Sequence, residues 1–179
     1  MAVRDDVLVW VDLEMTGLDP ERCVIVEAAV ILTDRELNAV GEPLNLAIWQ
    51  PDSVLETMEP FVRDMHTKSG LLERIRKSDL SVAGAEAQMM ELVAKHCGYR
   101  TAPLCGNTIG QDRRFLVKYM PQFEGFLHYR NIDVSTVKEL GLWWHKEKYI
   151  KPSAGKHTAM HDIEQSIEEL KYFRSKIFR

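Results

Sequence analysis

An unbroken apolar run near the start of the chain, residues 7–11, is followed directly by two acidic residues, Asp12 and Glu14. The run contains only Val, Leu and Trp, which is typical of a strand that is buried on both faces. Residues two apart in an extended chain point to the same side, so the two carboxylates should emerge side by side. Thr16 and Gly17 then turn the chain away. The sequence therefore predicts a buried strand whose end carries paired carboxylates.

Paired carboxylates at a buried strand end repel each other and lose hydration. A divalent cation would remove this penalty, since Mg²⁺ and Mn²⁺ bind carboxylate oxygens. The alternative is an acidic strand end that faces water, and Asp12 and Glu14 taken alone favour that simpler interpretation. The choice depends on whether further carboxylates arrive from elsewhere in the chain.

A length of 179 residues predicts one domain spanning 1–179, large enough to bury a core without disulfides or a structural metal. The 45% hydrophobic and 28% charged residues match an ordinary globular protein. Three widely spaced cysteines, Cys23, Cys97 and Cys105, form neither a disulfide framework nor a zinc motif. With neither a signal peptide nor a membrane span in the pattern, we expect a cytoplasmic protein.

The charge balance constrains the possible partners. The formal net charge is −4 and the isoelectric point is about 5.9. Proteins that grip long nucleic acids neutralise many phosphates and tend to be basic. A nucleic-acid substrate would therefore be a short one, held through few phosphates.

The order of the expected elements predicts the fold class. Runs rich in β-branched residues at 22–33 and 45–49 follow the first strand at a spacing typical of an antiparallel meander. Shorter strands at 103–107 and 127–134 alternate with helices, which predicts an α/β fold with a mixed central sheet of about five strands flanked by helices. Glu27, inside the second run, is interpreted as a structural buried polar group. Helices are expected at 54–58, 67–75, from 79 or 81 to about 97, 110–120, 135–144 and 158–178, with a loop at 145–156.

Two further carboxylates lie near the starts of expected helices. Asp112 precedes Phe115 and Leu116, which mark the buried side of its helix, although the helix dipole alone would favour an acid there. Asp162 follows His157 by five positions at the start of the last helix. Taken alone, His157 and Asp162 favour a simpler interpretation, in which Asp162 pairs with a lysine at the surface. Each feature taken alone has a structural explanation.

Taken together, these residues indicate phosphodiester chemistry. Two metal ions that clamp an in-line phosphoryl displacement need about four carboxylates, and Asp12, Glu14, Asp112 and Asp162 supply them. Hydrolysis also needs a base that takes a proton from the attacking water. His157 suits that role at neutral pH.

The combination of Asp-x-Glu, a mid-chain Asp and His-x-Ala-x-x-Asp resembles the DEDDh branch of the 3′–5′ exonucleases, which share an RNase H-like fold. Three blocks, residues 10–20, 104–116 and 128–136, resemble the oligoribonuclease family in particular. The resemblance runs from about Val7 to the C-terminus at consistent spacing. It implies a single exonuclease domain over 1–179.

The resemblance implies a homodimeric 3′–5′ exoribonuclease that degrades short RNAs, dinucleotides above all, to nucleoside 5′-monophosphates. Two Mg²⁺ or Mn²⁺ ions would be its cofactors, and His157 would be the general base. The metal ligands would be Asp12, Glu14, Asp112 and Asp162. The implied partners include 5′-phosphorylated dinucleotides and a second copy of the chain, but no membrane and no long nucleic acid.

The resemblance also implies roles for substrate-binding residues. Leu18 would wedge against the bases, Phe61 would help to hold a base, and Tyr129 would reach in from the partner subunit. A closed cap around the 5′-phosphate would limit the substrate length and needs only a few charge-assisted hydrogen bonds. The residues that match this cap are His66, Thr108, Arg130 and Ser135.

Three positions depart from the family pattern. Phe61 stands where tryptophan is usual, so the stacking face remains but the indole N–H is lost. Thr108 replaces a usual serine and keeps the hydroxyl, and His161 replaces a usual aspartate beside Asp162. None of these changes removes an expected metal ligand.

Two other functions remain open on the sequence alone. One is a DEDDh proofreading or repair exonuclease that acts on DNA, which the acidic isoelectric point disfavours. The other is an inactive binding module on the same fold, although all five catalytic-type residues are present. The apolar residues Leu140, Leu142, Trp143 and Trp144 would serve either a subunit interface or the core.

Overall fold

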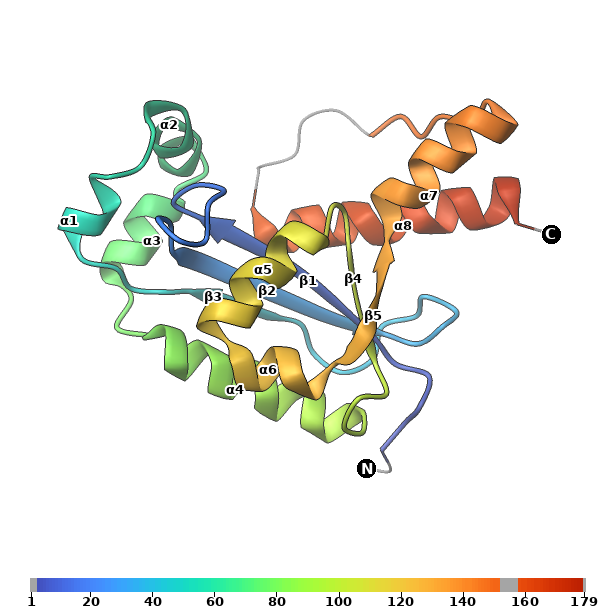
Figure 1. Cartoon of the computed structure of the whole chain (residues 1–179), viewed down its shortest axis with the longest axis horizontal. Coiled ribbons are helices and arrows are strands. Elements are labelled where there is room, and N and C mark those ends of the chain that lie inside the picture. Colours follow the sequence, from blue (N-terminus) through green and yellow to red (C-terminus); the bar gives the residue numbers. More distant parts are fainter. Residues whose placement is uncertain (1–2, 152–157, 179) are drawn as a thin grey trace.

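A five-stranded mixed sheet forms the centre of the computed structural model, which describes residues 3–151 and 158–178 (Figure 1). The strand order is β3-β2-β1-β4-β5, with β1 antiparallel to β2, β2 antiparallel to β3, and β1, β4 and β5 parallel. The predicted α/β fold, with three leading antiparallel strands, is confirmed. The strands are β1 (Leu8–Met15), β2 (Ile25–Thr33), β3 (Leu44–Ala47), β4 (Pro103–Gly106) and β5 (His128–Asp133).

Helices cover the two faces of the sheet (Figure 1). Val9, Val11 and Leu13 of β1 pack in one core cluster with residues of α4, α5 and α6. Leu8 and Trp10 point the other way and pack with residues of α8. Because strand residues alternate between faces, Asp12 and Glu14 lie on the same face as Leu8 and Trp10, the face that α8 covers. These covering helices are α4 (Val82–His96), α5 (Gly110–Tyr119), α6 (Pro121–Phe126) and α8 (Ala159–Ile177).

The segment between β3 and α4 differs from the sequence prediction. The structure has α1 (Asp52–Leu55), α2 (Pro60–Lys68) and α3 (Leu71–Lys77) there, so a single helix over 67–75 is wrong. Pro60 begins α2, because proline is well tolerated at the first helical position. Gly70 adopts a φ of +78°, a left-handed conformation that separates α2 from α3.

The C-terminal half brings two further corrections. Pro121 begins α6 directly after α5, although the sequence predicts no helix between 110–120 and the strand at 127–134. The Glu86 carboxylate of α4 accepts hydrogen bonds from the Gln122 and Phe123 amides and so anchors this short helix. The helix expected at 135–144 is α7 (Val134–Leu140), which continues as a π-helical turn, η1 (Gly141–His145).

The apolar residues around η1 belong to the surface rather than to the core. Leu142, Trp143 and Trp144 are exposed by 44%, 58% and 71%. Leu140 is partly buried. Within the described part of the chain, every helix is too short or too polar to span a bilayer.

Candidate nuclease active site

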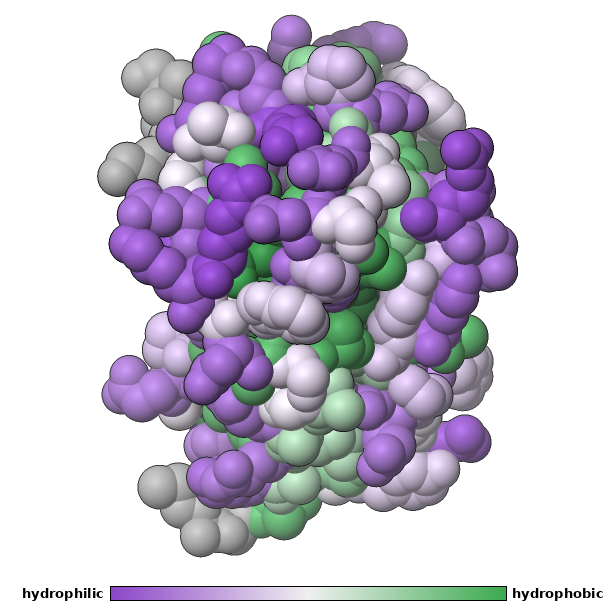
Figure 2. Space-filling view, turned by 90° about the vertical axis from the view of Figure 1, so that its left-hand side faces the viewer, coloured by the Kyte–Doolittle hydropathy of each residue, from purple (hydrophilic) through white to green (hydrophobic). Residues whose placement is uncertain are grey.

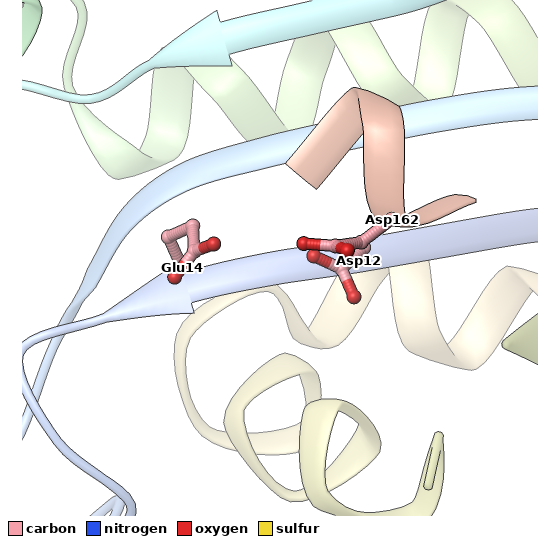
Figure 3. A group of neighbouring side chains, drawn as sticks. All are labelled: Asp12, Glu14 and Asp162. Atoms are coloured by element: carbon pink, nitrogen blue, oxygen red, sulfur yellow. The ribbon is translucent and has the colours of Figure 1, made fainter. Parts of the chain in front are cut away.

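The carboxyl ends of β1, β4 and β5 meet at one edge of the sheet because these three strands run parallel. In open α/β sheets this edge is where ligands bind. The Asp12–Glu14 segment ends β1, the loop with Thr108 follows β4, and Ser135 follows β5. The first turn of α8, with Asp162, reaches the same edge (Figure 3). Sequence-distant candidates are thus brought together by the strand order.

Three of the predicted metal ligands form a compact group. One carboxylate oxygen each from Asp12, Glu14 and Asp162 lies within 4.8 Å of the others. Figure 3 shows Asp12 and Glu14 on the same side of β1, with Asp162 reaching them from the first turn of α8. All three are partly buried. This donor set fits a hard divalent cation, which prefers carboxylate oxygens.

Asp112 lies beside this group but is not one of the three residues whose carboxylate oxygens lie within 4.8 Å of one another. It is 7% exposed on the first turn of α5. Its Oδ1 accepts a hydrogen bond from the Leu13 amide at 3.0 Å, between Asp12 and Glu14 on β1. The predicted fourth carboxylate is therefore attached to the strand that carries the first two.

Burial and mutual repulsion raise the pKa of these carboxyl groups. Burial is the largest cause at each site, and it raises the pKa of Asp12 to about 9, of Glu14 to about 8 and of Asp112 to about 7. Repulsion from neighbouring carboxylates adds to the increase for Asp12 and Glu14. Close like charges in a poorly solvated site have this effect. A divalent cation would stabilise the ionised forms.

The predicted general base, His157, lies outside the described residues. Ala159, the alanine of the same motif two positions later, is among the described residues. It is fully buried and is the first residue of α8. His161, at the position where the family usually has aspartate, is half-buried with its Nδ1 at 3.9 Å from Glu164 Oε2. The substitution leaves Asp162 within the carboxylate group.

Two exposed apolar side chains lie on segments that adjoin the end of β1. Leu18, in the β1–β2 turn, is 72% exposed and Phe61, on α2, is 78% exposed. The turn and α2 lie at the same end of the molecule (Figure 1), and Figure 2 shows hydrophobic surface between hydrophilic groups on that side. Gln111 of α5 donates a hydrogen bond to the Leu18 carbonyl and so holds the turn. Exposed apolar groups of this kind suit nucleobases.

His66 is not an ordinary surface residue at a helix start. It is 1% exposed, and its Nε2 donates to the Met15 carbonyl at 2.9 Å. Its Nδ1 lies 3.9 Å from Glu14 Oε2. The imidazole therefore joins α2 to the end of β1.

Thr108 and Ser135 are held by one carboxylate, that of Asp133. Asp133 Oδ1 accepts hydrogen bonds from the Thr108 amide at 3.0 Å, the Ser135 amide at 3.0 Å and the Ser135 hydroxyl at 2.6 Å. Thr108 has a φ of +53°, which is rare for a β-branched residue. The bond to Asp133 helps to hold this conformation and places the Thr108 backbone next to Ser135.

Tyr129 and Arg130 lie exposed on β5, an edge strand of the sheet. The Arg130 guanidinium carbon lies 5.4 Å from the centre of the Tyr129 ring. Tyr129 also stacks on His128, with ring centres 4.5 Å apart. Both predicted substrate residues are therefore available at the surface.

Comparison with known proteins identifies the family. The RNase T exonuclease family model matches residues 9–170. The chain is 52% identical to the oligoribonuclease of Marinobacter nauticus over 176 residues, covering 97% of each chain. It is 50% identical to that of Vibrio campbellii over 180 residues, covering 100% of this chain and 99% of that one. The chain belongs to the oligoribonuclease family of exonucleases. It is therefore a 3′–5′ exoribonuclease, a hydrolase of RNA.

Solved structures show the same fold at low sequence identity. Escherichia coli exonuclease I in a zinc-bound complex with single-stranded DNA has a TM-score of 0.73 at 18% identity, covering 98% of this chain and 42% of that chain. Exonuclease I of Methylocaldum szegediense has a TM-score of 0.71 at 19% identity, covering 96% and 41%. The chain spans less than half of those proteins, so the likeness shows the exonuclease fold alone.

Sequence reasoning missed two residues of this oligoribonuclease-family site. Asp133 organises Thr108 and Ser135, and an Asp two positions before a Ser at a helix start could have indicated a cap. Glu27 received no chemical role, yet β2 places it directly opposite Glu14. A carboxylate inside a buried run needs a partner, but only the strand register reveals which residues it meets.

We expect the metal-free protein to lose stability as the pH rises from 6 to 9. The pKa values of Asp12 and Glu14 increase on folding from 3.8 to about 9 and from 4.5 to about 8. At pH values between the unfolded and the folded pKa of each group, the folded state retains a proton that the unfolded chain has released. The free energy of unfolding therefore falls with rising pH. Thermal unfolding in EDTA at pH 6, 7.5 and 9 measures this decline.

The Asp12→Asn variant is the matched control, because it removes one of the two titrating carboxyl groups at nearly constant volume. Its melting temperature should fall less than that of the wild type over the same pH range. Equal declines in the two proteins would contradict the assignment of these raised pKa values.

Proposed function

We propose that this exoribonuclease hydrolyses very short RNAs, dinucleotides above all, to nucleoside 5′-monophosphates with the help of two divalent cations, Mg²⁺ or Mn²⁺. The observation that carries this proposal is the group of Asp12, Glu14 and Asp162 oxygens within 4.8 Å, with Asp112 bonded to the same strand. We further propose that residues 1–179 act as one exonuclease domain, which the family match over residues 9–170 supports.

The donor chemistry fits divalent cations. The four carboxylates Asp12, Glu14, Asp112 and Asp162 would hold the ions, and their repulsion in a partly buried site is the penalty that cations remove. When bound, the cations supply charge stabilisation to the phosphoryl oxygens during an in-line displacement. His157 would take the proton from the attacking water, a role that rests on its place in the family motif.

The surroundings of the carboxylates support recognition of short substrates. Leu18 and Phe61 would hold the bases through apolar contacts. Thr108 and Arg130 would bind the 5′-phosphate through neutral and charge-assisted hydrogen bonds, and the Ser135 hydroxyl would join them by turning away from Asp133. His66, buried and bonded to the Met15 carbonyl, would instead support the end of β1 from α2. Asp133 supports this cap because it keeps Thr108 and Ser135 together. A cap that closes on the 5′-phosphate leaves no path for a longer strand.

We also propose that the enzyme is a cytoplasmic homodimer in which Tyr129 reaches the partner's site. The 72% exposure of Tyr129 on an edge strand supports this arrangement, and the exposed Trp143 and Trp144 offer further apolar area. Light scattering tests the dimer, since a particle mass equal to the chain's 20.6 kDa would contradict it. The unpaired state of all three cysteines is compatible with the cytoplasm, which cell fractionation would test.

The metal assignment predicts that Asp112→Asn lowers turnover by roughly 100-fold or more, because bound metal contributes several kcal/mol of charge stabilisation. The amide keeps the side-chain volume and an oxygen that can accept the Leu13 hydrogen bond. Initial rates on an RNA dinucleotide with Mn²⁺ measure the loss. Asp64→Asn, which neutralises an exposed acid of α2 paired with Lys68, should keep wild-type rates. Unchanged hydrolysis by Asp112→Asn would remove Asp112 from the metal site.

The cap assignment predicts that Arg130→Ala loses its preference for 5′-phosphorylated over 5′-hydroxyl dinucleotides. A hydrogen bond to a charged group contributes about 1.5–3 kcal/mol, so kcat/KM for the phosphorylated substrate should fall about 10- to 100-fold. Arg100→Ala is the matched control, because Arg100 also lies over a tyrosine ring, that of Tyr99, at 5.3 Å. If Arg130→Ala keeps the preference of the Arg100→Ala protein, Arg130 does not bind the 5′-phosphate.

A further inference from the structure

Glu27 is a buried carboxylate that the metal group does not include. It lies on β2 with an exposed fraction of 0% and pairs directly with Glu14 of β1 across the antiparallel ladder. Directly opposed residues share one face of a sheet, so Glu27 belongs to the face that carries Asp12 and Glu14 and that α8 covers. An ionised group in this position needs compensating contacts.

The two oxygens of Glu27 contact two different helices. Oε1 accepts a hydrogen bond from Arg74 Nη1 of α3. Oε2 accepts from the backbone amide of Ala159, the first residue of α8, at 3.3 Å. The side chain therefore joins the central sheet to the helix that carries Asp162, three residues further along.

The contact with Ala159 satisfies a need of the α8 N-terminus. The first amides of a helix have no partner within the helix. The Thr158 side chain accepts from the His161 amide at 3.4 Å, and Glu27 accepts from the Ala159 amide. A carboxylate is also favoured at this end by the helix dipole. The full burial of Ala159 brings the backbone of α8 close enough to the sheet for this bond.

Arg74 compensates the charge of Glu27. Its guanidinium reaches inward from a side chain that is 41% exposed and also contacts Asn45 Oδ1 of β3 at 3.5 Å. Glu27 and Glu14 face each other across the ladder, and like charges opposed in this way destabilise a cross-strand pair; the ion pair with Arg74 offsets this repulsion. Arg74 thus lets a carboxylate stand beside the metal group without joining it.

We propose that Glu27 is a positioning residue, which fixes the start of α8 and with it Asp162 against Asp12 and Glu14, with Arg74 as its counter-charge. The proposal rests on the role of Asp162 as a metal ligand. Glu27 acts through Asp162 and touches neither substrate nor cation. Supporting partners of metal ligands typically change metal affinity or activity by about 10- to 100-fold when they are removed.

Two charge-neutral double variants separate positioning from charge. Glu27→Gln with Arg74→Ala keeps an oxygen that can accept from the Ala159 amide. Glu27→Leu with Arg74→Ala keeps a similar side-chain volume but offers no acceptor. Relative to the glutamine variant, the leucine variant should show kcat and Mn²⁺ affinity reduced by about 10- to 100-fold, with KM for a dinucleotide unchanged.

The readouts include two that need no turnover. Titration calorimetry measures Mn²⁺ binding without substrate, and hydrogen exchange in EDTA measures protection of the Ala159 amide, which should be lost in the leucine variant. Arg76→Ala is the control for α3, because Arg76 pairs with Asp52 at the surface. It should match the wild type in all assays.

The failure of each idea has its own signature. Equal Ala159 protection and equal Mn²⁺ affinity in the two double variants would overturn the positioning role of Glu27. Retention of wild-type Mn²⁺ affinity and turnover by Asp162→Asn would instead overturn the metal assignment of the proposed function. In that case Ala159 protection alone still decides whether Glu27 holds α8.

Discussion

Electrostatic repulsion among carboxylates on one face of a central strand is the constraint on which the rest of the site depends. Asp12 and Glu14 occupy the α8 side of β1, where Leu8 and Trp10 pack earlier in the same strand. The strand thus passes from an apolar to an acidic half within one sheet face. Burial and repulsion raise the pKa of both carboxyl groups, to about 9 and about 8. The metal-free fold bears this strain, which a divalent cation would relieve.

The surrounding elements hold the acidic groups in place despite this repulsion. The Leu13 amide donates to Asp112 and thereby attaches α5 to β1. Glu27, balanced by Arg74, accepts from the first amide of α8. Two backbone amides and one guanidinium thus place partial or full positive charge beside the carboxylates, which need it. Each contact joins the sheet or its first strand to a different helix, so local placement of the acids depends on the whole fold.

Local patterns in the sequence predicted much of this arrangement. The alternation of β1 placed Asp12 and Glu14 on one face, as found. Gly70 interrupts the helix expected over 67–75, because it adopts a left-handed φ. The sequence missed this break, since the φ of a glycine depends on the tertiary path of the chain. The role of Glu27 could not be read from the sequence, since it depends on a cross-strand register and on contacts with residues 47 and 132 positions away. Likewise, Asp133 joins Thr108 to Ser135 only because β4 and β5 are neighbours.

The most direct test of the account compares hydrolysis of a 5′-phosphorylated RNA dinucleotide with that of a seven-nucleotide RNA, each in Mn²⁺ and in EDTA. The carboxylate group and the closed cap together predict fast hydrolysis of the dinucleotide in Mn²⁺, slow hydrolysis of the longer RNA and none in EDTA. Equal rates on the two RNAs would contradict the closed cap. Hydrolysis that continues in EDTA would contradict the metal-dependent centre.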